Sequence, residues 1–109
     1  MYLKTNKNKY DIIIATNFSK RLMGLMGKTN IDYGMLFPKC NSIHTYFMKE
    51  NIDIIGLDEN NEVIYKYENL DKNRIIKINY DIKKTSILEL PANSSKKIKM
   101  GTILIFNED

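Results

Sequence analysis

The residues of this chain that could do chemistry gather between positions 42 and 58. This stretch holds the only histidine, His44, and an aspartate, Asp53, which stands alone in the apolar run 52–57. A histidine and a carboxylate can act as general base and acid, and both can bind a ligand. Among Ile and Leu, a carboxylate needs hydrogen-bond partners if it is buried, or it faces a cleft. The stretch is therefore a candidate site, although its residues do not indicate a particular reaction.

A β-hairpin turning at Glu50–Asn51 is the expected geometry of this stretch. In that register Met48 pairs with Asp53. Because strand side chains alternate with period two, the even-numbered residues from His44 to Met48 share a face with Asp53. Arg21 is expected to form an ion pair with Asp53 or to bind an anionic ligand bidentately. The predicted ligand-binding set is Arg21, His44, Tyr46, Met48, Lys49 and Asp53.

Three classes of function remain open for this set. The leading prediction is a non-catalytic domain that binds a small molecule or a peptide segment, because no nucleophile–base arrangement is evident. The alternative is a hydrolase-like or lyase-like enzyme with His44 as base and Asp53 as its orienter or as the acid. A metal variant would use His44, Asp53 and Glu89, but we expect no metal and no cofactor. A structural or interaction protein is the third class.

Composition narrows the partners and the compartment. The net charge of +4 comes from 17 basic and 13 acidic residues, and every basic residue except Arg21 and Arg74 is lysine. Together with frequent Asn and Ile, this bias indicates an AT-rich coding background, so we expect no nucleic-acid partner. The single cysteine, Cys40, excludes an internal disulfide and a Cys-rich zinc site. With no apolar run near ~20 residues and no leader pattern, the sequence predicts a cytoplasmic protein without a membrane partner.

Short strands dominate the secondary structure expected from the residue pattern. Alternating or continuous apolar runs predict strands at 2–4, 11–15, 62–67, 74–79, 86–90 and 102–106, in addition to the hairpin. Asn17 is expected to cap a short helix to about Met26, and Asn93 a single helical turn ending near Met100. The prediction is one mainly β domain over residues 1–109, a compact barrel or a jelly-roll-like sandwich with two short helices.

Two of the expected strands bear on assembly. Residues 2–4 and 103–106 are predicted to lie at sheet edges, where unpaired backbone groups invite a partner strand. Lysines at positions 4, 7 and 9 would protect such an edge against aggregation and still admit an acidic partner. We therefore expect a monomer, with any dimer small in interface and sensitive to salt.

Five motifs in order resemble the domain of unknown function 192 family. They are Arg21-Leu22-Met23-Gly24-Leu25-Met26, Gly34-Met35-Leu36-Phe37, His44-Thr45 with Met48 and Ile52-Asp53-Ile54, Leu88-Glu89-Leu90-Pro91-Ala92, and Lys99-Met100-Gly101. The resemblance covers about 11–106 and implies a compact β fold of jelly-roll type with no established activity. The chain departs from the family pattern in three places. Phe18-Ser19-Lys20 stands where Pro and acidic residues are usual, Asn51 stands where Pro is common, and Thr102 replaces the usual Asp.

Overall fold

Nine β-strands form the framework of the described part of the chain. The computed structural model describes residues 1–5, 8–17 and 24–108. The strands are β1 (Tyr2–Lys4), β2 (Lys9–Ile14), β3 (Gly34–Phe37), β4 (Ser42–His44), β5 (Ile52–Leu57), β6 (Val63–Leu70), β7 (Ile75–Lys77), β8 (Ser86–Pro91) and β9 (Phe106–Asn107), with a 3₁₀ turn, η1 (Ile82–Lys84), before β8. Seven strands form one mixed sheet in the order β6-β5-β8-β3-β2-β1-β9, and β4 pairs with β7 separately. The prediction of a mainly β fold is confirmed.

Strand β5 is an interior strand of the large sheet, next to the terminal strand β6. It pairs antiparallel with β6 on one side and with β8 on the other. Every residue of the run Ile52–Leu57 is buried. A strand covered on both faces is typically apolar without alternation, which is the pattern of this run apart from Asp53. Asp53 is therefore the one residue of β5 that needs a polar environment.

Two hydrophobic cores lie on opposite faces of this sheet. Ile54 of β5 and Ile87 of β8 belong to the first core, which also contains Met35, Phe37, Met48 and Ile76. Ile55 and Leu88 belong to the second, with Leu3, Ile98 and Leu104. Because side chains alternate along a strand, each neighbouring pair of residues in β5 and β8 supplies both cores. We call these faces the first-core face and the second-core face.

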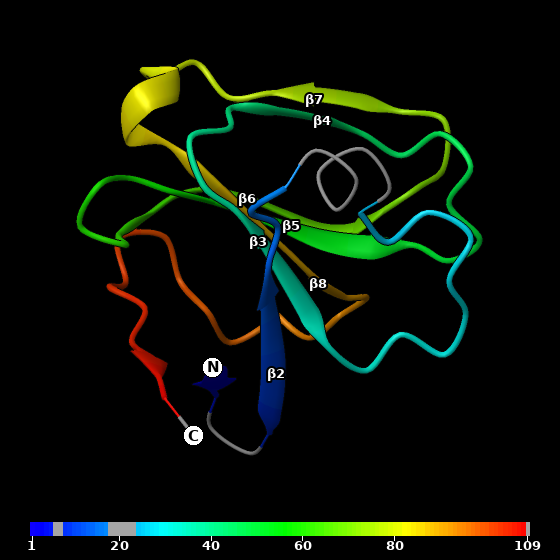
Figure 1. Cartoon of the computed structure of the whole chain (residues 1–109), viewed down its shortest axis with the longest axis horizontal. Helices are drawn as coiled ribbons and strands as arrows, with labels where there is room; N and C mark the ends of the chain where they lie inside the picture. The colour runs from blue at the N-terminus through cyan, green and yellow to red at the C-terminus, as the bar shows by residue number, and fades with distance from the viewer. Residues whose placement is uncertain (6–7, 18–23, 109) are drawn as a thin grey trace.

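The pair β4–β7 covers the first-core face, above the large sheet in the view of Figure 1. Ile76 and Ile78, in and just after β7, are both buried in the first core. Ile78 lies directly over Gly56 of β5, where an added Cβ would come within 2.5 Å of the Ile78 Cδ1 atom. A side chain at position 56 would therefore push this layer away from the sheet.

The two termini come together at the far end of the sheet (Figure 1). Strand β1 pairs with β2 on one side and with β9 on the other, so the prediction that β1 is an edge strand is wrong. The segment before β9 also returns to the start of β6, where Ile103 bridges Glu62. The sheet curls without closing, because β6 and β9 remain its two ends in the described part of the chain. The barrel form of the prediction is therefore corrected to an open, curled sheet.

The predicted hairpin and helices also need correction. Strand β4 pairs with β7 and not with β5, and Asp53 lies opposite Leu90 of β8. Residues 18–23 of the first predicted helix lie outside the described residues, and the part from Gly24 to Gly27 forms turns. The predicted second helical turn consists of hydrogen-bonded turns over 92–97. Tertiary pairing decided the first of these differences, since β4 finds its partner more than thirty positions away in β7.

Among the residues that the structure describes, no helix has the length and apolar character needed to cross a membrane.

Candidate functional site

Asp53 is fully buried on the second-core face, where it accepts four hydrogen bonds. Its Oδ1 atom accepts from the backbone N–H groups of Asn69 and Asn93, each at 2.8 Å. Its Oδ2 atom accepts from the Ser95 backbone N–H at 2.9 Å and from the Ser95 hydroxyl. A buried carboxylate with this many donors is stabilised in place, because each donor replaces a lost water contact. Asp53 thereby ties the loop after β8 to strands β5 and β6.

The structure does not bring Asp53 and His44 together. Glu89 pairs in register with Ile54 and so points to the first-core face, whereas Asp53 pairs with Leu90 and points to the second-core face. His44 lines a cavity together with Glu89, which places it on the first-core side of the sheet. The expected shared face of His44 and Asp53 is therefore not observed, since the sheet separates them.

His44 ends strand β4 and is exposed. Its Nδ1 atom accepts a hydrogen bond from the Tyr46 backbone N–H at 3.2 Å, which fixes the orientation of the ring. The Tyr46 ring lies beside it, with 5.3 Å between ring centroids. The Tyr46 N–H therefore holds the imidazole at the rim of the cavity.

The cavity beside His44 is small and largely apolar. Its volume is about 120 Å³, room for roughly four water molecules. Its lining comes from the loop before β3, from β3 and β4, and from β8: Gly24, Leu25, Met26, Phe37, Cys40, Ser42, Ile43, His44, Met48 and Glu89. No lysine or arginine of the described residues is among them. We call this cavity the Glu89 pocket.

Glu89 is the chemically unusual residue of this pocket. It is buried on strand β8, and its Oε1 atom has no hydrogen-bond partner among the described residues. Burial raises the pKa of the Glu89 carboxyl from 4.5 to about 8, because desolvation disfavours the charged form. At neutral pH the side chain is therefore a neutral acid that can donate one hydrogen bond and accept others. An unpaired buried carboxyl facing a cavity is a common feature of functional sites.

Gly24 closes one side of the pocket directly over this carboxyl. A Cβ at this position would lie 3.3 Å from Phe37 Cζ and 3.5 Å from Glu89 Oε1. Its backbone has φ of 49°, in the left-handed region that glycine adopts without steric cost.

Gly24→Ala is therefore expected to reduce the cavity and to lower the free energy of unfolding by about 1–2 kcal/mol. Urea denaturation measures the stability change, and Gly27→Ala is the matched control. Gly27 also has a positive φ, of 71°, but nothing lies within 4 Å of an added Cβ. A fall in the free energy of unfolding in Gly27→Ala as large as in Gly24→Ala would contradict the assignment of Gly24 to the pocket wall.

The other predicted site residues are distributed around this region. Met48 is buried and lines the Glu89 pocket. Lys49 is exposed and is not part of the lining. Arg21 lies outside the described residues. Among those described, no group of three His, Cys, Asp or Glu side chains is placed to hold a metal ion, and His44, Asp53 and Glu89 are divided between the two faces.

Comparison with known proteins places the chain in a family. Residues 1–105 match the DUF192 family, described as Uncharacterized ACR, COG1430. The chain belongs to this family. A UPF0127 protein of Thermococcus sibiricus is 42% identical to this DUF192 domain over 57 residues, which are 47% of the domain. The same residues are 37% of the relative, so the alignment spans little more than a third of that protein.

Two solved structures share the fold of this DUF192 domain. A protein of unknown function from Novosphingobium aromaticivorans has a TM-score of 0.76 and 15% identity, over 96% of this chain and 82% of the other. A protein from Sinorhizobium meliloti, described as a candidate transcription regulator, has a TM-score of 0.72 and 22% identity, over 95% and 89%. At these identities the likeness shows the fold alone.

The sequence pattern predicted Glu89 as a site residue only in the variant with a bound metal. The signal was present in the run from Ile87 to Leu90, where Glu89 is the only polar residue. A strand that alternates apolar and polar residues presents its polar side chains to water. Only the position of β8 between β5 and β3 shows that both of its faces are covered.

Proposed function

We propose that this domain is a non-catalytic binding module that takes a small cationic head group in the Glu89 pocket. The observation that carries the proposal is the buried Glu89 carboxyl, whose Oε1 atom has no hydrogen-bond partner within the described part of the chain. A buried carboxylate is stable only when it is paired, and the described residues of the pocket lining supply no cation. An ammonium or guanidinium group from a ligand or from a partner's side chain would provide that charge.

The size of the pocket sets the size of the occupant. At about 120 Å³ it is well below the ~300–1,000 Å³ of sites that enclose a drug-sized ligand. It therefore accepts a head group of a few heavy atoms, with the rest of the molecule outside, near His44. Phe37 and Met48 supply the apolar contacts around the head group, and Phe37 also offers an aromatic ring to a cation. We propose further that the domain acts as a cytoplasmic monomer.

Methylguanidinium is expected to stabilise the protein in a thermal-shift experiment. At about ten times its Kd, binding to the folded state adds about 1.4 kcal/mol and raises Tm by about 6 °C. Glu89→Gln is expected to abolish this shift, because the amide cannot take the negative charge that the cation requires.

Two controls separate this result from non-specific effects. Acetamide resembles the head group in size without its charge and is expected to give no comparable shift, while Glu108→Gln removes an exposed carboxylate and keeps the response. Because cation binding releases the Glu89 proton, affinity is expected to rise about tenfold per pH unit up to about pH 8. Equal shifts with acetamide, or a full response in Glu89→Gln, would overturn the proposal.

General acid catalysis is a second candidate function of the same pocket. It is favoured by the raised pKa of Glu89 in a cavity that also presents Ser42 and His44. In this candidate function Glu89, and not Asp53, acts together with His44. The Asp53 oxygens already accept hydrogen bonds from backbone N–H groups and from the Ser95 hydroxyl. Turnover in a panel of ester and lyase substrates that is lost in both Glu89→Gln and His44→Ala would support it, and turnover retained in both would exclude it.

A further inference from the structure

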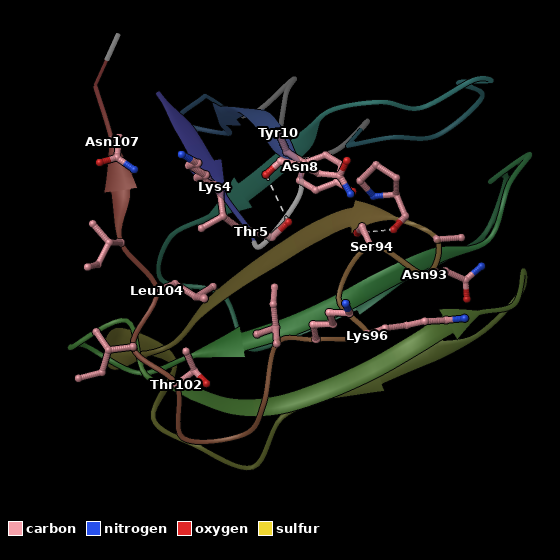
Figure 2. Close-up of a pocket in the computed structure, with 17 residues that line it drawn as sticks. Lys4, Thr5, Asn8, Tyr10, Asn93, Ser94, Lys96, Thr102, Leu104 and Asn107 are labelled. Carbon is pink, nitrogen blue, oxygen red and sulfur yellow. Dashed lines mark hydrogen bonds between the residues drawn. The ribbon is translucent and has the colours of Figure 1, made fainter.

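A second, larger cavity lies on the other side of the sheet. It opens between β1, the turns after β8 and the segment that leads to β9, as Figure 2 shows. Its volume is about 860 Å³, within the range of ligand sites. Apolar side chains form its floor: Leu3, Tyr10, Ile98 and Leu104. We call this cavity the lysine groove, and it shares no lining residue with the Glu89 pocket.

The charged residues of the lysine groove all have one sign. Lys4, Lys96 and Lys97 line it, and no aspartate or glutamate is part of the described lining. No ion pair joins these three ammonium groups to a described residue. By contrast, Lys66 pairs with Glu68 at 3.4 Å and Lys84 with Glu59 at 3.9 Å. The groove therefore offers three available cations above an apolar floor.

The wall that carries two of these lysines is fixed from behind. Asp53 accepts hydrogen bonds from the backbone of Asn93 and Ser95. Three residues after Ser95, the Ile98 carbonyl accepts a hydrogen bond from Lys66 Nζ at 2.7 Å. These bonds hold the turns after β8 against β5 and β6, so the wall is ordered before any ligand arrives. Preorganisation of this kind lowers the entropic cost of binding.

Strand addition by a peptide does not suit this groove. Strand β1 already pairs with β2 along its whole length and with β9 at Tyr2 and Leu3. A peptide that adds a strand depends on unpaired main-chain groups for its affinity. The groove instead offers side chains: an apolar floor and a cationic rim. That combination matches a molecule with an aliphatic tail and an anionic head.

We propose that the lysine groove binds a single-chain amphipathic carboxylate, taken up as a monomer from solution. The tail lies on Leu3, Ile98 and Leu104, and the carboxylate meets Lys96 and Lys97 on the wall after β8, with Lys4 across the groove (Figure 2). The concave shape favours one enclosed chain over a membrane surface, because a cavity of this volume buries most of a small ligand. This site is independent of any ligand in the Glu89 pocket.

Decanoate is the probe, and methyl NMR of Leu3, Ile98 and Leu104 is the measurement. Titration below the concentration at which decanoate forms micelles is expected to give saturable shifts at these methyl groups, and affinity is expected to increase from hexanoate to decanoate. Decyltrimethylammonium carries the same tail with a positive head and is expected to bind at least tenfold more weakly. Equal affinity of the two amphiphiles, or no saturable shift in the groove, would overturn the proposal.

Paired variants test the role of the lysines. Lys96→Gln with Lys97→Gln is expected to weaken decanoate about five- to tenfold. Lys83→Gln removes an exposed lysine of η1 that lies outside the groove and is expected to leave affinity unchanged. All of these lysines are exposed, so folding is expected to be preserved. Unchanged affinity for decanoate in the double variant would contradict the assignment. Sedimentation of the protein with anionic phosphatidylserine vesicles, without any binding of monomeric decanoate, would contradict it as well.

Discussion

Glu89→Gln is expected to stabilise the folded protein at neutral and alkaline pH. Burial raises the pKa of the Glu89 carboxyl from 4.5 to about 8. Between these values the unfolded chain has released the proton and the folded chain still holds it. The free energy of unfolding therefore falls as pH rises from about 4.5 to about 8, by up to about 1.4 kcal/mol per pH unit. Glutamine has the same shape without an ionisable proton, so it removes this loss.

Urea denaturation at several pH values measures the effect. From about pH 5 to about pH 8 the wild-type protein is expected to lose about 2–4 kcal/mol more than Glu89→Gln. This is a large share of the ~5–15 kcal/mol typical of a domain. Glu108→Gln, which changes an exposed carboxylate, is expected to follow the wild type. Parallel curves for wild type and Glu89→Gln would show that the carboxyl is ionised in the folded state and would remove the basis of the cationic-ligand proposal.

Asp53→Ala is expected to cause the largest loss of stability of any single substitution considered. The substitution removes the acceptor of the backbone N–H groups of Asn69, Asn93 and Ser95, and leaves a gap in a fully buried site. Each buried donor without a partner costs about 1–3 kcal/mol, so the expected total is about 3–5 kcal/mol. Asp53→Asn keeps one acceptor but turns an NH₂ group towards the Ser95 N–H. Its expected loss is about 2–3 kcal/mol.

Chemical denaturation and amide hydrogen exchange together test this role. Faster exchange is expected at Asn69, Asn93 and Ser95 in both variants, because these amides lose their acceptor. Asp11→Asn changes an exposed aspartate of β2 and is expected to alter stability by less than about 0.5 kcal/mol. If Asp53→Ala were as stable as Asp11→Asn, the carboxylate would have to serve binding and not structure.

The strands with a regular residue pattern were predictable because the pattern itself carries the signal. The apolar run 52–57 forms the buried strand β5, and the run 86–90 forms β8 nearly residue for residue. Asp53 was likewise recognised as a carboxylate that must be paired or face a cleft. Whether Asp53 is paired or faces a cleft depended on Asn93 and Ser95, which lie 40 and 42 positions farther along the chain. No local residue pattern could supply these partners.

The sequence by itself therefore determined a mainly β domain, its strong strands and its family, since these depend on local periodicity and on ordered motifs. The tertiary structure alone decided which strands pair and which faces are covered. Strand β4 joins β7, so His44 shares a pocket with Glu89, and the β5–β8 register sends Asp53 to the opposite face. Register and burial arise from contacts between distant segments, and a shift of one residue reverses every side chain of a strand. For that reason Asp53, a predicted site residue, is held by backbone and hydroxyl donors, whereas Glu89 lines the pocket.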